Sequence, residues 1–358
     1  MSDVSFEQPR SRTENWLRWI ALFLGALLVV VFCLVLKALQ TILIPFCIAL
    51  FLVYLAEPLQ KGLIGLKIPK GVRIFVILLC TALLLYLVGL LVYSSVKSLN
   101  QTLPQYEQRV VGLLDHLAQS LPIPSEDITS FMQNFSWADQ VKPGTIAQMI
   151  GTSFGKFGGF LGNLFLVLLY MVYLLYERES FFKRVQNSFQ SERAQQITLV
   201  VKQINQGIAN YLKIKTTLSV VTGGLVTVIL FLFGVDLALF WGILTFLLNF
   251  IPSIGSIIAT FFPVIISFLQ FDSLWVPFII FLLLVSLQVM IGNVVEPRVM
   301  GGKLGLSPLV VILSLIFWGW LWGPTGMILS VPILSALRIV CDHIEILRPI
   351  SGFIAEKS

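Results

Sequence analysis

Eight long stretches of the sequence contain no charged side chain, and they limit the fold more than any other feature. They cover residues 19–36, 38–56, 74–96, 157–176, 216–235, 237–271, 273–295 and 304–337. A helix of about 20 apolar residues crosses the roughly 30 Å hydrocarbon core of a bilayer. Only 12% of all residues are charged and 57% are hydrophobic, against about 25% charged in soluble domains. The sequence therefore predicts an all-α, polytopic helical membrane protein and excludes a soluble enzyme.

Two of these stretches have lengths that do not suit simple spans. Residues 237–271 and 304–337 number 35 and 34, and as unbroken helix each would reach ~50 Å. Each is interrupted near its middle, by PSIG at 252–255 and by GPTG at 323–326. Proline removes a backbone donor and glycine permits a turn, so we expect the tips of two helical hairpins here. Two short full spans on either side of each turn are the alternative, which gives about six full spans plus two hairpins, or six to ten crossings.

The lysines and arginines that flank the spans give one consistent orientation. With the N-terminal arginines in the cytoplasm, all but five of the 24 basic residues fall on that side, as the positive-inside rule requires. This holds only if each long run returns to the side that it left. Asp236 and Asp272 then flank the first run outside, whereas Lys303 and Arg338 flank the second run inside. We expect both chain termini to be cytoplasmic.

The same patterns divide the chain into five parts. They are an N-terminal tail with three spans (1–96), a polar outer segment (97–156), a fourth span with a cytoplasmic amphipathic helix (157–215), a transport core with both hairpins (216–340) and a cytoplasmic tail (341–358). Short helices are expected at 107–118 and 125–135, after a break at Pro104. Apolar residues recur at helical spacing between 197 and 211. This pattern fits a helix on the membrane surface or one that packs on other cytoplasmic residues.

The fifth and sixth spans, each followed by a long broken run, form a candidate repeat. The first unit starts inside and the second starts outside, so the order is the same and the orientation is opposite. Phe-Trp-Gly precedes both tips, at 240–242 and 317–319, and Pro263 and Pro332 follow them. Inverted repeats of this kind place a substrate site near the bilayer midplane, where interrupted helices meet. The pattern predicts a cavity between the hairpins.

Polar side chains inside a span are costly and mark candidate sites. In the sixth span, Gln288, Gly292 and Glu296 fall on one side of an α-helix, and Asn293 lies beside Gly292. Glu296 precedes Pro297, so it is either a salt-bridged helix end or a residue that couples transport to an ion or a proton.

The hairpin tips supply the remaining candidates for a substrate or ion pathway. These are Asn249, Pro252, Ser253 and Gly255 at the first tip and Gly323, Pro324 and Gly326 at the second. For Asn249 and Ser253, backbone capping within the turn is the alternative to ligand contact.

Motifs of enzymes are absent from the sequence. It contains no Gly-x-Ser-x-Gly, no His-Glu-x-x-His and no P-loop. The four cysteines and two histidines have no metal-ligand spacing. We expect no catalysis, no cofactor, no metal and no ATP hydrolysis by this chain. Topology and anionic membrane lipid explain the net charge of +6, so no nucleic-acid partner is expected.

Four motifs in the C-terminal half are highly specific. They are NFIPSIG at 249–255, GNVVEPRVMG at 292–301, LGLSPL at 304–309 and WGWLWGPTGM at 318–327. These strings resemble the autoinducer-2 exporter family of bacterial membrane proteins. The resemblance implies a multi-span permease of the bacterial inner membrane. Some members are associated with export of a small quorum-sensing molecule and others with sodium or lithium efflux against protons. It also suggests a homo-oligomer, with a pentamer as one candidate.

The resulting prediction is a permease that moves a small solute, for which export of a small polar signalling molecule such as autoinducer-2 is the first choice. A sodium or lithium/proton antiporter and a passive oligomeric channel are the alternatives. Autoinducer-2 is a small neutral polyol and would need amides such as Asn249, Gln288 and Asn293. A cation would need Glu296 instead, and the sequence offers both.

Overall fold

The computed structural model describes residues 12–120, 157–188, 191–300 and 305–355, and these residues are almost entirely helical. The first half contains α1 (Arg12–Ala38), α2 (Gln40–Leu55), α3 (Glu57–Gly65), α4 (Lys70–Ser120), α8 (Phe157–Ser188) and α9 (Ser191–Leu232). The second half contains α10 (Ala238–Leu248), α11 (Ile254–Gln270), α12 (Trp275–Val289), a π-helix (Met290–Val295), α13 (Glu296–Met300), α14 (Pro308–His343), a 3-10 helix (Glu345–Leu347) and α15 (Arg348–Ile354). In the described ranges the sole β-type pairing is one isolated bridge between Leu306 and Ala355.

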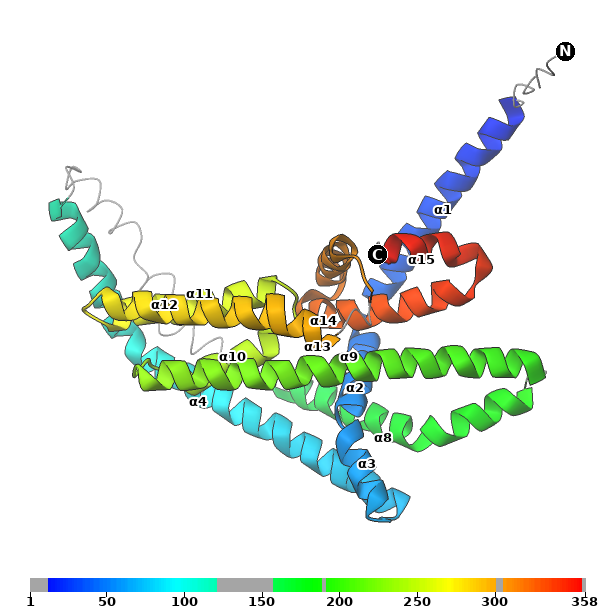
Figure 1. Ribbon diagram of the computed structural model, residues 1–358, viewed down its shortest axis with the longest axis horizontal. Helices are drawn as coiled ribbons and strands as arrows, with labels where there is room; N and C mark the ends of the chain where they lie inside the picture. Colours follow the sequence, from blue (N-terminus) through cyan, green and yellow to red (C-terminus); the bar gives the residue numbers. More distant parts are fainter. Residues whose placement is uncertain (1–11, 121–156, 189–190, 301–304, 356–358) are drawn as a thin grey trace.

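Several of these helices are long and apolar enough to cross a bilayer. Within the described residues there are five of them, in α1, α4, α9, α12 with its extension and α14. The pair α2 and α3, bent by 46°, makes a sixth. Helix α1 projects away from the rest of the molecule (Figure 1), and no described residue of its apolar part is buried. The predicted all-α polytopic membrane fold is confirmed.

Helix α4 differs from the prediction at Pro104. We expected a break there, but the helix continues through this residue to Ser120. A proline inside a helix costs about 3 kcal/mol, and the turn that follows Pro104 contacts the first hairpin through Tyr106 and Arg109. Residues 107–118 are helical as part of α4, whereas the expected helix at 125–135 lies outside the described residues.

Helix α9 joins two segments that the sequence pattern had separated. The predicted amphipathic helix and the fifth span form one helix of 42 residues, which runs along much of the molecule (Figure 1). Its Ile208, Tyr211 and Leu212 are buried against Tyr54 of α2 and Val331 of α14. At these positions, packing within the protein replaces the alternative of a membrane-surface helix.

The first long apolar run folds back on itself. Helices α10 and α11 have 11 and 17 residues, so they are about 16 and 25 Å long, shorter than the roughly 30 Å bilayer core. Gln270 closes the base of this hairpin. Its side-chain oxygen accepts a hydrogen bond from the Asp236 backbone N–H (2.8 Å), and its Nε2 donates to the Gly234 carbonyl (2.7 Å). The run therefore folds as a helical hairpin, and its first arm is too short to cross the bilayer.

The base of the first hairpin is attached to the C-terminal part of α4. The Tyr106 hydroxyl donates to Asp236 at 2.7 Å, and Arg109 pairs with Asp272. Burial raises the pKa of Tyr106, and the hydrogen bond to Asp236 raises this pKa further, so the hydroxyl stays protonated and donates. Because both aspartates contact one turn of α4, the two ends of the run lie together, as the orientation analysis requires.

The second long run also folds back. Gly323 has φ 64° and ψ −147°, which interrupts α14. The Ser314 hydroxyl donates to the Ser330 carbonyl at 3.3 Å, although residues 16 apart in a straight helix are separated by about 24 Å. A Cβ at Gly326 would lie 2.0 Å from the Trp318 carbonyl oxygen. The arms before and after Gly323 therefore lie side by side.

The open end of the second hairpin packs against α15. The Ser307 N–H donates to the Ile354 carbonyl at 2.9 Å. A Cβ at Gly305 would lie 2.4 Å from the Arg338 guanidinium, so the residues that flank the run lie close together. Lys303, the other flanking residue, lies outside the described residues. Part of the predicted C-terminal tail is thus packed against this hairpin.

Phe51 of α2 packs against residues of both hairpins. Its ring lies 5.4 Å from that of Phe250 in the first tip, and it packs against the cluster of Leu321, Trp322 and Leu329 in the second hairpin. The α11–α12 loop and the C-terminal end of α14 lie at opposite ends of the molecule (Figure 1). The two hairpins therefore begin at opposite ends of the molecule, and the inverted repeat stays a prediction.

Candidate functional site

One face of α9 carries a row of buried polar side chains. Tyr211, Lys215, Ser219 and Thr222 follow one another at spacings of four, four and three residues, which places them on the same side of a helix. Their exposed fractions are 4%, 4%, 0% and 0%. A buried polar row on an apolar helix marks a candidate site, because each of these groups needs a partner.

Lys215 forms an ion pair with Glu296, the first residue of α13. The Lys215 Nζ lies 2.6 Å from Glu296 Oε1, and the side chains are 4% and 21% exposed. Removing one partner of a buried pair costs roughly 3–5 kcal/mol, because the other charge is left uncompensated. The structure thus favours the salt-bridged reading of Glu296, with a partner that the sequence analysis did not identify. Tyr211, Lys215 and Glu296 are called the ion-pair site below.

The π-helix that precedes Glu296 changes the direction in which this residue points. A π turn contains an extra residue, which rotates all later side chains relative to an α-helix. The expected shared face of Gln288, Gly292 and Glu296 stays a prediction, and the surroundings of these residues differ. Gln288 lines a groove between α11 and α12, Gly292 and Asn293 are exposed, and Glu296 faces α9.

Two buried hydroxyls near the pair have no hydrogen-bond partner among the residues that the structure describes. They belong to Tyr211, one turn before Lys215 on α9, and to Thr216. A buried polar group without a partner is destabilising by about 1–3 kcal/mol. Such groups are retained where a solute, an ion or water supplies the missing hydrogen bond, which adds donor and acceptor capacity to the ion-pair site.

Asn249 brings the first hairpin tip to the same face of α9. Its Nδ2 donates to the Ser219 hydroxyl at 3.0 Å, one turn beyond Lys215. The amide therefore contacts α9 and does not cap its own turn. Of the predicted site residues, the structure brings Asn249 and Glu296 to one helix face, through Ser219 and Lys215.

The other predicted residues at the first tip shape the turn. Ser253 is exposed with φ 59°, and its carbonyl accepts a hydrogen bond from the Ser256 hydroxyl at 2.8 Å. Pro252 is half-buried before it. A Cβ at Gly255 would lie 1.8 Å from the Leu248 carbonyl oxygen, so this glycine allows the two arms to approach.

The second tip has the same construction. Gly323 supplies the positive φ, Pro324 follows it on the exposed side, and Gly326 allows the close approach to Trp318. These three residues position the arms of the hairpin.

The sequence analysis missed Lys215, Tyr211 and Ser219. Lys215 was counted with the cytoplasmic lysines because it stands at the edge of a charge-free run. The spacing of Tyr211, Lys215, Ser219 and Thr222 could have revealed the row, since a polar group at every helical turn inside an apolar helix defines a face.

A helical membrane fold with interrupted helices and a polar site between them is typical of membrane transporters. The comparisons with known proteins agree with this class. The family model described as AI-2E family transporter matches residues 22–346, so the chain belongs to the AI-2E family. It is similar to transport proteins of Borreliella burgdorferi (32% identity over 93% of this chain and 90% of the relative) and Haemophilus influenzae (32%, 92% and 94%). It is also similar to the AI-2 transport protein TqsA of Escherichia coli K12 (31%, 92% and 93%). The chain is a multi-pass bacterial membrane transport protein.

Proposed function

We propose that this chain exports a small uncharged polar solute, such as autoinducer-2, across the bacterial inner membrane, and that a proton or cation at Glu296 drives the export. The buried Lys215–Glu296 ion pair is the observation that carries the proposal. One similar protein is named for AI-2 transport, and the sequence contains no P-loop for ATP hydrolysis. The proposal includes cytoplasmic termini and assembly as a homo-oligomer.

The ion pair suits a coupling role because it joins the segments that lead into the two hairpins. Lys215 belongs to α9, which leads into the first hairpin, and Glu296 belongs to the segment between α12 and the second hairpin. A proton or cation on Glu296 neutralises the carboxylate and removes its attraction for Lys215. Each 1.4 kcal/mol of lost interaction changes a two-state equilibrium about tenfold. Occupancy of Glu296 can therefore shift the relative stability of two arrangements of the repeats.

The test is transport by the Glu296→Gln variant in reconstituted vesicles under imposed proton and sodium gradients. Glutamine keeps the shape but carries no charge to bind a cation, so the gradient-dependent part of transport should disappear. Because Lys215 then lacks its counter-charge and the protein is destabilised, transport is scaled to the amount of folded, assembled protein in the vesicles. Glu345→Gln, which removes an exposed carboxylate outside the site, is the matched control and should transport as the wild type does. Gradient-driven transport by Glu296→Gln at the wild-type rate would remove Glu296 from the mechanism.

Cation/proton antiport is the second candidate, and the same ion pair favours it, because a carboxylate in apolar surroundings can hold a monovalent cation itself. The vesicle assay separates the two functions. Exporters show saturable counterflow of the solute, whereas an antiporter moves sodium or lithium without any organic solute. Single-channel currents would instead indicate the passive oligomeric channel.

A further inference from the structure

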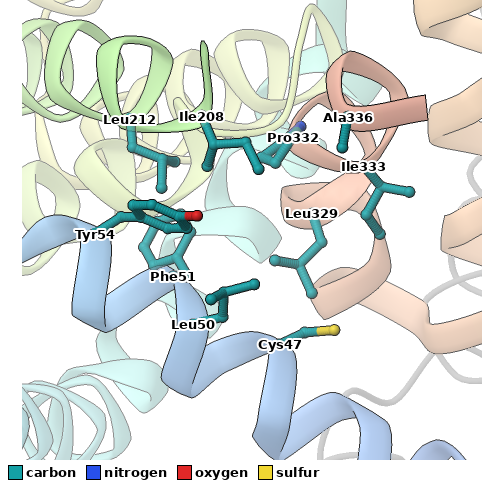
Figure 2. A pocket seen from close by; sticks show the side chains of 10 residues that line it. All are labelled: Cys47, Leu50, Phe51, Tyr54, Ile208, Leu212, Leu329, Pro332, Ile333 and Ala336. Atoms are coloured by element: carbon teal, nitrogen blue, oxygen red, sulfur yellow. The ribbon is translucent and has the colours of Figure 1, made fainter. Parts of the chain in front are cut away.

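Three cavities of the molecule share one side chain, Tyr54 of α2. The first, called the apolar chamber, has a volume of about 170 Å³ and lies between α2, α9 and α14. Figure 2 shows Tyr54 and Phe51 of α2 on one side of this chamber and Leu329 and Ile333 of α14 on the opposite side. Ile208 of α9 lies between these two sides. Apart from the Tyr54 hydroxyl and the Cys47 thiol, hydrocarbon side chains line it.

The second cavity, called the polar vestibule, borders Tyr54 from another direction. It has a volume of about 330 Å³ and is lined by charged and amide side chains, among them Glu57, Lys61, Asn210 and Lys213. The third, of about 380 Å³, lies between α2, α8 and α9 and shares Tyr54 with both of the others.

A hydrogen bond between α2 and α9 lies where these cavities meet. The Tyr54 hydroxyl donates to the Asn205 side-chain oxygen of α9. Tyr54 is 8% exposed, and Asn205 lines the vestibule and the third cavity but not the apolar chamber. The bonded pair therefore separates the polar space from the apolar one.

We propose that the Tyr54–Asn205 pair is a gate through which a small uncharged solute passes from the polar vestibule into the apolar chamber. The inference rests on the proposed export function but replaces autoinducer-2, which is a polyol, with a less polar solute. An ion loses too much hydration to enter a chamber of hydrocarbon side chains, and a polyol would leave several hydroxyls without partners. An apolar cavity of about 150 Å³ holds benzene. The chamber thus suits a compact molecule with an apolar body and one or two polar groups.

Labelling of the native Cys47 measures access to the apolar chamber, and it does not require the solute to be known. The whole protein in vesicles of phosphatidylethanolamine and phosphatidylglycerol is treated with uncharged hydroxyethyl methanethiosulfonate or with its charged trimethylammonium analogue. Labelling of each cysteine is then read by peptide mass spectrometry. Cys80, which is exposed on α4, is the internal reference in the same chain.

Opening the gate should speed the labelling of Cys47. Tyr54→Phe and Asn205→Ala each remove the hydrogen bond, so the uncharged reagent should label Cys47 several-fold to about tenfold faster, with Cys80 unchanged. The charged reagent should stay slow in every variant. Tyr173→Phe, which removes an exposed hydroxyl from the third cavity, is the control and should change nothing. An unchanged Cys47 rate in both gate variants, or equal rates for both reagents, would overturn the gate.

A transport measurement separates this inference from the proposed function. Ala336→Trp fills the chamber and should stop solute counterflow, whereas Leu337→Trp, at the next and exposed position, should not. Transport by both the wild-type protein and Ala336→Trp would refute the path through the apolar chamber and leave the proposed export function intact. Absence of solute transport by the wild type, together with faster Cys47 labelling in the gate variants, would refute the export function and leave the gate intact. If Ala336→Trp fails to fold, the Cys47 labelling rates still test the gate.

Discussion

Lys215 is the residue whose position is most unusual for its type. Lysine is rarely buried unless it is paired, and here only 4% of the side chain is exposed, in a helix that is long and apolar enough to cross a membrane. Its ammonium therefore depends on Glu296. A buried ion pair of this kind adds little stability compared with apolar side chains of similar volume, so stability alone does not explain its presence.

This dependence predicts a non-additive pair of substitutions. Lys215→Met should lower the free energy of unfolding by roughly 3–5 kcal/mol, because Glu296 is then an uncompensated buried charge. The double variant with Glu296→Leu should recover most of that loss and still lack gradient-driven transport. Thermal unfolding in detergent provides the measurement, with exposed Lys213→Met as the neutral control. A double variant no more stable than Lys215→Met would contradict the pairing.

Some residues of the site could be predicted from the sequence and others could not. Glu296 and Asn249 were found because polar side chains are conspicuous inside apolar spans. Lys215 was not, because flanking lysines are normally assigned to loops. The π-helix before Glu296 was also not predicted, because nothing in the local composition indicates a change from the period of 3.6 residues.

At the scale of the elements, two glycines make the hairpins possible. Gly255→Val and Gly326→Val each place a branched side chain against a carbonyl oxygen that would lie 1.8 or 2.0 Å from its Cβ. The arms must then separate, so each variant should be destabilised by about 1–3 kcal/mol or more. Thermal unfolding tests this.

The control for that prediction is Gly224→Ala in α9, where an added Cβ meets nothing within 4 Å. Alanine there should be neutral or stabilising by up to about 1 kcal/mol. If the valine variants unfold at the temperature of this control, the close approach of the arms is not required.

The hairpins were predictable as elements, whereas the continuity of α4 and α9 was not. Proline and glycine in the middle of long apolar runs are strong local signals, and both turns occur where they stand. Pro104 is an equally strong signal, yet α4 passes through it, because contacts with a hairpin far along the chain stabilise the helix. Local sequence cannot report such contacts.

At the scale of the whole molecule, the bases of the two hairpins should face opposite sides of the membrane. Cysteine replacing Ser273, beside the first base, should react with an impermeant thiol reagent applied outside the cell. Cysteine replacing Ile344, near the second base, should react only after the membrane is permeabilised, which gives the reagent access to the cytoplasmic face. Both positions are exposed. The parent protein without these substitutions shows how much labelling comes from the native cysteines. Reaction of both from one side would contradict the opposed arrangement.

The position of Phe51 has a consequence for how this transporter can change shape. Its ring lies beside Phe250 of the first hairpin and against the cluster of Leu321, Trp322 and Leu329 in the second hairpin, so a movement of either hairpin must displace this ring. Interiors are close-packed and yield little. A shift of one hairpin would therefore be transmitted to the other through a single benzyl group, which couples their movements mechanically.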